Sequence, residues 1–520
     1  MYNQCSVRNP MEKNMRALVL LFLCCWSLAE VVNGQQQQQR EGQMQQQQSC
    51  RTQHLSAQQP YETIRSEGGT IELSTRQDND ELDCAGVEFI RETVERDCLA
   101  LQRFSNVPEI RYVVEGQGWL GVVFPGCPET FRRSPFEEEG ECQRRRGGEG
   151  RGRGERGRGG EGEEEQRGRG REEECSRHER ERAREESSQK IRRVRRGDVV
   201  AIYAGVAYWW YNDGDTPLRT VAIADASNHQ NQLDKRYRPF FLAGSSATRE
   251  RRERQGEGQR YGGNVLAGFD PNMLAEALGV RRQVVIDIQE NNRESGLIVR
   301  VNEPLRPRPG RGAPQFFNTF VEDSEEDERE GVNPGGLHQF YCNMRLRHNA
   351  DRPDDADVFV RDGGRLNTVN RFKLPALTHL NLAAERGVLR PGAMFAPSWV
   401  ACHAILYATR GDARIQVVEN RGRRVFDGRV QEGQFLVIPQ FYAVMKRAGD
   451  QGFDWITFTT CHSPIRSSFT GRNSVLKAMP QEVVMNAYNI SMREAHELRW
   501  NREHEFLILP PRGSRRESEE

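Results

Sequence analysis

Alternating apolar and polar residues predict strands in several parts of the chain. Phe89-Ile-Arg-Glu-Thr-Val94 alternates with a period of two, and residues 110–124 are typical of two strands about a Gly-rich turn. Strands resume at Asp198-Val-Val-Ala-Ile-Tyr203, after a tract of Arg, Glu and Gly at 132–190. Such a tract cannot bury a core. The pattern therefore indicates a mainly β fold with a solvated, disordered insertion at 132–190.

An internal repeat runs through the chain. Residues 112–118 resemble 406–412, each predicted as a strand that enters a glycine turn, and Gly197–Gly205 resembles Gly433–Phe441. Residues 265–280 match 475–490 without a gap, and both stretches are predicted to be helical. In the first of them Asp270 is the predicted N-cap, with Pro271 at the first helical position. The order of these features predicts a duplicated module of strands followed by helices.

The spacing of the repeat locates the insertion. The interval from Gly116 to Gly197 exceeds that from Gly411 to Gly433 by 59 residues, which is the length of segment 132–190. A long loop between fixed ends costs little closure entropy. The two modules are therefore expected to be comparable apart from this insertion.

The N-terminus is typical of a secretory signal peptide. Arg8, Lys13 and Arg16 precede an apolar run at 17–29, and small residues allow cleavage near 29 or 34. The run is shorter than the ~20 residues that span a bilayer, so no membrane association is expected. Removal of residues 1–34 leaves nine cysteines in an oxidising compartment, an odd number that requires a free or intermolecular thiol.

Charge gives no reason to expect a nucleic-acid partner. Lys and Arg total 75, as do Asp and Glu, and residues 137–190 carry 17 Glu against 15 Arg and Lys. Phosphate binding needs a cationic excess. Of the 75 cationic residues 69 are Arg, which, with the Gln tract at 35–49, stores nitrogen densely.

A motif from Gly197 to Asn212 resembles the second conserved motif of the cupins, which are jelly-roll barrels. Metal-dependent cupins hold their ion with three histidines and a glutamate. Here Tyr208 and Val444 stand where a histidine is expected, and the paired His-x-His is absent, leaving only His403. We therefore predict no metal, cofactor or catalytic residue, and no enzyme.

Two alternatives remain open. One is a metal-dependent bicupin enzyme. The other is a small-ligand-binding cupin, for a sugar or hormone, whose barrel mouth is lined by Tyr208, Trp209 and Trp210.

Five stretches together resemble the legumin-type (11S) seed storage globulins. They are residues 126–131, 196–217, 342–349, 377–382 and 487–491. The resemblance implies a bicupin of two jelly-roll β-barrels, each followed by a small helical arm. It also implies a nutrient reservoir, often a food allergen, sent through the secretory pathway to the protein storage vacuole. Trimers form through the helical arms and stack into hexamers, with the same or related subunits.

The resemblance divides the chain into six parts. These are a signal peptide (1–34), a Gln-rich segment (35–49), a first barrel and arm (50–300), an acidic linker (301–336), a second barrel and arm (337–510) and a polar tail (511–520).

The family pattern also implies two disulfides. One, from Cys127 to Cys342, would join the acidic and basic chains cut from one precursor, and the other would join Cys50 to Cys84. The pairing of the remaining cysteines stays open: Cys98, Cys142, Cys175, Cys402 and Cys461.

Two modification sites complete the expectations. An asparagine-specific vacuolar protease would cut between Asn333 and Pro334, slowly or incompletely because proline rigidifies the leaving side. The sequon at Asn489 is expected to be mostly unused, because it falls in the predicted terminal helix.

Overall fold

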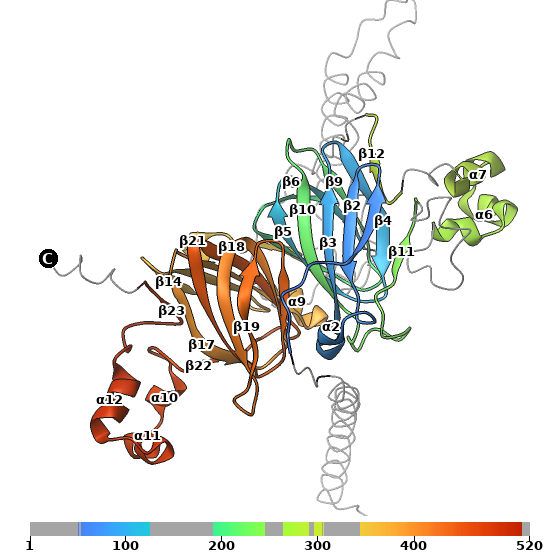
Figure 1. The fold of residues 1–520 in the computed structure, drawn as a ribbon. Helices are drawn as coiled ribbons and strands as arrows, with labels where there is room; N and C mark the ends of the chain where they lie inside the picture. Colours follow the sequence, from blue (N-terminus) through green and yellow to red (C-terminus); the bar gives the residue numbers. More distant parts are fainter. Residues whose placement is uncertain are drawn as a thin grey trace, which may run out of the picture.

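The computed structural model describes residues 50, 54–124, 191–244, 264–290, 296–303, 305 and 344–511. They form two β barrels side by side, and each barrel carries a group of helices at its outer end (Figure 1). The expected mainly β bicupin fold is therefore confirmed. The predicted signal peptide, the Gln-rich segment and the insertion at 132–190 lie outside the described residues.

The first barrel consists of two antiparallel sheets. One has the order β1-β2-β3-β10-β5-β8-β13, and the other has β11-β4-β9-β6-β7 with β12 beside β4. The strands are β1 (Glu62–Ser66), β2 (Gly69–Ser74), β3 (Val87–Val94), β4 (Cys98–Ser105), β5 (Glu109–Glu115), β6 (Gln117–Val123), β7 (Ile191–Arg195), β8 (Asp198–Ile202), β9 (Ala207–Asn212), β10 (Leu218–Asp225), β11 (Pro239–Phe241), β12 (Ile298–Arg300) and β13 (Arg347–Asn349).

The second barrel is one ten-stranded sheet that closes through long, bent strands. Its strands are β14 (Val358–Val360), β15 (Gly364–Val369), β16 (Ala383–Leu389), β17 (Met394–Val400), β18 (Ala404–Val418), β19 (Arg424–Gln431), β20 (Phe435–Ile438), β21 (Ala443–Thr459), β22 (Arg466–Ser468) and β23 (Ile508–Leu509). Gly411, predicted to end a strand in a turn, instead lies within β18 at φ +68°. The pairing of β18 with β21 shifts register there, and a β-bulge is where a glycine of positive φ fits a strand. The predicted turn was therefore wrong.

The two barrels exchange short segments. β13 follows the linker in sequence but pairs with β8 of the first barrel, from Arg347 opposite Val200 to Asn349 opposite Asp198. Before the first barrel begins, Gln58 bridges Phe435 of β20. The sheets thus do not divide at residue 337, where the second module was expected to start. The edge of a sheet offers unpaired N–H and C=O groups to any nearby strand, and β13 pairs with such an edge in the first barrel although it directly precedes the second module in sequence.

Two helical arms extend from opposite ends of the pair of barrels (Figure 1). The first arm contains η2 (Val265–Gly268), α6 (Pro271–Leu278) and α7 (Arg282–Glu290), and the second contains α10 (Val475–Ala478), α11 (Gln481–Tyr488) and α12 (Met492–Trp500). Asp270 caps α6 with Pro271 at its first position, which confirms that prediction. In the described parts of the chain, no helix is long and apolar enough to cross a membrane.

Two short helices lie near the junction of the barrels: α2 (Asp80–Ala85) and α9 (Leu377–Leu380) (Figure 1). The apolar core is continuous across this junction. The ring of Phe89 on β3 stacks on those of Tyr407 and Phe435 of the second barrel, with centroids 5.6 and 4.6 Å apart. The barrels are therefore fixed to each other by core packing.

Candidate functional site

The interior of the first barrel holds a closed network of charges around Tyr208. Its hydroxyl accepts from Arg103 Nε at 2.9 Å and Arg111 Nη2 at 3.1 Å, and it donates to Glu109 at 3.1 Å. Arg111 also donates to Glu109 Oε2 at 2.9 Å and to Glu92 Oε2 at 2.8 Å. Glu92 pairs with Arg103 as well. The two guanidinium groups are thus matched by two carboxylates.

Burial and ion pairing determine the protonation states of the residues in this network. Tyr208 and Arg111 are fully buried. Burial raises the pKa of the Tyr208 hydroxyl, so the phenol stays neutral. Burial also acts to raise the pKa of Glu92, but Arg103 and Arg111 outweigh it and hold that pKa below its usual range. An added cation would face two guanidinium groups, and both carboxylates are already paired.

The second barrel is apolar where a metal-binding cupin would place its ligand. Val444 lies on β21 and is 5% exposed. Two residues further along the same strand, Lys446 points to the same interior and is 3% exposed. Arg466 and Glu385 form an ion pair of 2.7 Å beside it. Among the described residues, neither interior presents the three histidines and glutamate of a metal-dependent cupin.

The aromatic residues considered as a ligand-binding mouth do not share one face. Tyr208 and Trp210 are buried in the core, whereas Trp209 points to the opposite side of β9 and packs against Gly121. Side chains alternate along a strand, so three consecutive residues cannot line one opening. The hypothesis of a mouth built from all three is therefore wrong.

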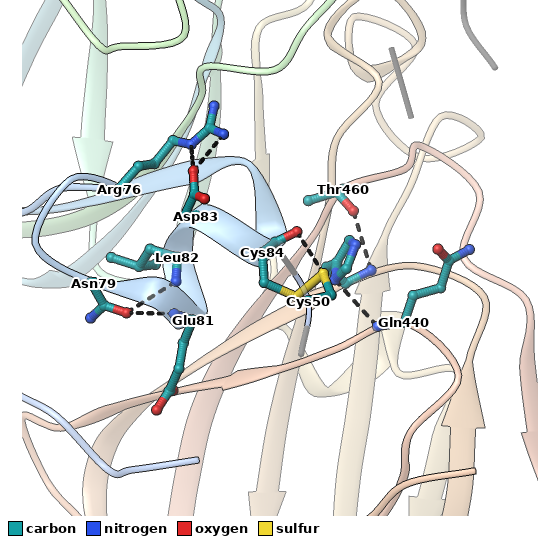
Figure 2. The surroundings of a disulfide bond; sticks show 10 residues. Cys50, Arg76, Asn79, Glu81, Leu82, Asp83, Cys84, Gln440 and Thr460 are labelled. Carbon is teal, nitrogen blue, oxygen red and sulfur yellow. Dashed lines mark hydrogen bonds and ion pairs between the residues drawn. A yellow bond between two sulfur atoms is a disulfide. The ribbon is translucent and has the colours of Figure 1, made fainter. Parts of the chain in front are cut away.

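A disulfide joins Cys50 to Cys84 at the junction of the barrels (Figure 2), with Cα atoms 4.5 Å apart. Cys84 lies in α2, whose N-cap Asn79 accepts from the backbone N–H groups of Glu81 and Leu82. The bond ties residue 50, before the first strand, to this helix.

A second disulfide joins Cys402 to Cys461, with Cα atoms 6.0 Å apart. The sequence left both cysteines unassigned. Ala404 pairs with Thr459 across β18 and β21, and continuing that register outward places residue 402 opposite 461. Knowing that β18 pairs with β21 would have been enough to identify this bond, but nothing local in the sequence reveals which strands pair. Among the described cysteines Cys98 is the free one, and it is buried.

His403 follows Cys402 in the chain, and its ring lies near the first disulfide. Gln440 donates its backbone N–H to His403 Nδ1 at 3.3 Å, and the His403 backbone N–H bonds to Thr460 Oγ1 at 3.2 Å. Burial lowers the pKa of His403 to about 4, so the imidazole is neutral at pH 7. Its ring lies within 4.8 Å of the Cys50 and Cys84 sulfurs, the single such grouping of possible metal ligands in the described residues. Both sulfurs are bonded to each other and therefore cannot serve as thiolate ligands.

Asn489 does not lie inside a helix as expected. It ends α11 as an exposed C-cap residue at φ +52°, a conformation that asparagine tolerates. Ser491 of the sequon then begins α12, in a capping box with Glu494. The sequon therefore spans an exposed turn, and its low use stays a prediction.

Several predicted site residues lie outside the described residues. These are Cys127, Cys142, Cys175, Asn333, Pro334 and Cys342.

Comparisons with known proteins agree with this geometry. A family model described as Cupin matches residues 54–247 and 348–496. The 11S globulin seed storage protein Ana o 2.0101 of Anacardium occidentale is 37% identical over 461 residues, which cover 88% of this chain and 92% of that protein. The crystal structure of the coconut allergen cocosin superposes with a TM-score of 0.69 at 33% identity, covering 89% of this chain and 100% of that one.

A further solved structure is an 11S globulin from Wrightia tinctoria that reveals an auxin binding site. It superposes with a TM-score of 0.69 at 32% identity and covers 89% of this chain and 97% of that one.

Proposed function

This chain belongs to the 11S seed storage globulins of the cupin superfamily, and from that premise we propose how it assembles, is processed and is stored. Its function is that of a seed nutrient reservoir. The observation that supports this best is the interior of the first barrel, where ion pairs of Arg103, Arg111, Glu92 and Glu109 fill the place of a metal. The relatives are storage globulins, which are not enzymes.

Assembly is proposed to use the two helical arms. Met273 and Leu278 on α6 are 72% and 50% exposed, and Met492 on α12 is 65% exposed. Apolar side chains gathered on a surface helix mark an interaction face. Because the two arms lie at opposite ends of the molecule, an arm-to-arm contact repeated around a three-fold axis closes a trimer of this chain or of related subunits. Trimers would then stack into hexamers.

Light scattering after size-exclusion chromatography tests this assembly. Met273→Glu and Met492→Glu together place charges in the proposed contact and are expected to give monomers. Leu233→Glu is the matched control, since Leu233 is similarly exposed, at 59%, but lies outside both arms. Trimers that persist in the double variant would contradict the proposal, as would monomers in the control.

Processing is proposed to separate an acidic from a basic chain after Asn333, by an asparagine-specific protease. Support comes from the Asn333-Pro334 bond, which follows the acidic run 322–330, and from the absence of another asparagine between residues 318 and 343. N-terminal sequencing of the basic chain from seed should give Pro334 beside uncut precursor. A complete cut at another bond would refute this.

The two chains are proposed to remain joined through Cys127 and Cys342. Cys342→Ser should release them on a non-reducing gel while the precursor still folds. Chains that remain covalently joined would assign the bridge elsewhere.

Storage is proposed to follow the secretory pathway to the protein storage vacuole. The basic and apolar character of residues 8–29 supports entry to that pathway. Fusion of residues 1–34 to a reporter should direct it into the lumen of the endoplasmic reticulum, with cleavage near 29 or 34. A cytosolic reporter of unchanged mass would contradict this.

Auxin binding, reported for the Wrightia tinctoria relative, is the second candidate. The cavity in the second barrel has about 20 Å³ of space for water centres, and that in the first about 10 Å³. One water occupies roughly 10–15 Å³ on this measure, so an indole does not fit either interior. Calorimetric titration with indole-3-acetate should therefore show no saturable heat from the barrels, and saturable binding abolished by a barrel substitution would revive this candidate.

A further inference from the structure

The second barrel encloses a small cavity with an excess of positive charge. Lys446 of β21, Arg466 of β22 and the Thr457 hydroxyl of β21 contribute its polar lining, and the rest includes Val400, Ala404 and Val444. Among the described residues, the carboxylate beside it is that of Glu385 on β16, which Arg466 Nη2 binds at 2.7 Å. When Lys446 is protonated, two cations therefore face one anion. The first barrel contrasts with this, since its two guanidinium groups meet two carboxylates.

Lys446 lacks the polar partner that a buried ammonium requires. Its Nζ lies 4.0 Å from the centroid of the Phe395 ring and 4.6 Å from that of Trp455. Within the described residues no hydrogen bond or ion pair reaches it, although it is only 3% exposed. Cation–π contacts offset part of the desolvation cost, but a buried charge normally also gains a counter-ion or hydrogen bonds.

A second polar group in the lining is also unsatisfied. The Thr457 Oγ1 atom is buried and has no hydrogen-bond partner among the described residues. Arg466 uses one N–H on Glu385 and another on Ser398 Oγ at 3.2 Å, so its five-donor guanidinium retains further N–H groups. An ammonium, a guanidinium and a hydroxyl thus converge as donors on one small space.

We propose that this cavity binds one small monovalent oxyanion, of formate size, between Lys446, Arg466 and Thr457. The donors supply two positive charges and the hydrogen bonds that a planar oxyanion accepts. The cavity volume of about 20 Å³ for water centres corresponds to one or two waters, so it suits formate, which has three non-hydrogen atoms, and excludes bulkier acids. Glu385 compensates one of the two positive charges of Lys446 and Arg466, and the bound anion neutralises the other.

Binding is coupled to protonation of Lys446. Burial lowers the pKa of Lys446 to about 7, with Glu385 acting to raise it and Arg466 to lower it. Among the described residues of the lining, the other titratable group is the Tyr442 phenol, whose pKa burial raises, so it stays neutral in this range. The competent, protonated fraction falls about tenfold between pH 6 and pH 8, and the apparent affinity for the anion should fall by the same factor.

Thermal unfolding of the full chain, with increasing sodium formate at constant ionic strength, tests the proposal. The unfolding midpoint of the wild type should rise saturably at pH 6, as mass action requires for a ligand of the folded state. Lys446→Met keeps the volume and the apolar contacts but should remove this response. Lys373→Met is the matched control, because Lys373 pairs with Asp357 at 3.0 Å outside the cavity.

Sodium pivalate separates a site from a general salt effect. It carries the same carboxylate on a group too large for the cavity, so it should leave the midpoint unchanged. A formate response that survives in Lys446→Met, or an equal response to pivalate, would overturn the proposal. So would a wild type that shows no saturable response.

A second measurement does not depend on folding of the lysine variant. Five lysines remain after residue 34, so ¹³C-labelled lysine gives few NMR signals, and that of Lys446 is expected to titrate at about pH 7. Formate should move this titration to higher pH, and Thr457→Val should weaken the shift. A titration that formate leaves unmoved would refute the site.

Discussion

Replacement of Tyr208 by Phe tests whether one hydroxyl holds the charges of the first barrel together. The substitution removes a single oxygen and leaves the ring in place. That oxygen bonds Arg103 at 2.9 Å, Arg111 at 3.1 Å and Glu109 at 3.1 Å. All four residues are buried, so bulk water does not reach the position of the lost partner.

The expected cost follows from these contacts. A hydrogen bond to a charged group contributes about 1.5–3 kcal/mol, and a charged donor left unsatisfied inside a protein costs more than a neutral one. The three bonds share one oxygen, and Glu109 keeps its bonds to Arg111 and Tyr237. We therefore expect Tyr208→Phe to lower the free energy of unfolding by about 3–5 kcal/mol.

Tyr237→Phe is compared with Tyr208→Phe because it should lower the free energy of unfolding by a smaller amount. Its hydroxyl also lies in this interior but makes one bond, to Glu109 Oε1 at 3.1 Å, so the expected cost is about 1–2 kcal/mol. Equilibrium urea unfolding followed by tryptophan fluorescence measures both, because Trp210 lies beside the network. Equal costs for the two variants, or a loss below about 1 kcal/mol in Tyr208→Phe, would refute the reasoning.

Three further substitutions test burial, packing and cross-linking. Burial raises the pKa of Asp225 to about 6, so the folded state holds its proton more tightly than the unfolded chain, and the free energy of unfolding falls as the pH rises through 6. Asp225→Asn should remove this loss of about 3 kcal/mol, so the urea midpoints of wild type and variant should diverge between pH 4 and pH 7. Parallel midpoint curves would contradict this. A Cβ at Gly387 would overlap the Trp455 indole, so Gly387→Ala should cost about 3 kcal/mol, whereas Gly268→Ala, with no neighbour within 4 Å, should be nearly neutral in the same assay. Cys50→Ser opens a disulfide of sequence separation 34 and should cost about 3–4 kcal/mol; thermal unfolding unchanged by the substitution or by reductant would refute that contribution.

Local features of the sequence predicted local features of the structure. The cap formed by Asp270 and the strands at 89–94 and 198–203 depend on neighbouring residues, and they form near where the pattern placed them. The stretch 475–490, predicted to be helical, consists of α10 and α11, which are separated at Met479 and Pro480 because proline cannot continue the preceding turn.

The sequence also showed which metal-ligand positions carry other residues, but it did not show which interactions those residues make. Tyr208 could be recognised as a residue in a histidine's place, yet nothing in the sequence shows that its partners are Arg103 and Arg111 from two other strands. Their convergence depends on the register in which β4 pairs with β9 and β5 with β8, which long-range contacts decide.

The sequence by itself determined that the chain repeats one module, lacks the histidines of a metal-dependent cupin and resembles the seed storage globulins. These conclusions rest on period, composition and motif, which are properties of neighbouring residues. Only the tertiary structure decided that Cys402 meets Cys461, that β13 joins the barrel before it and that Lys446 is buried against the rings of Phe395 and Trp455. The reason is physical: closing a barrel brings together residues far apart in sequence, and a shift of one residue in strand register would turn each of these side chains to the other face.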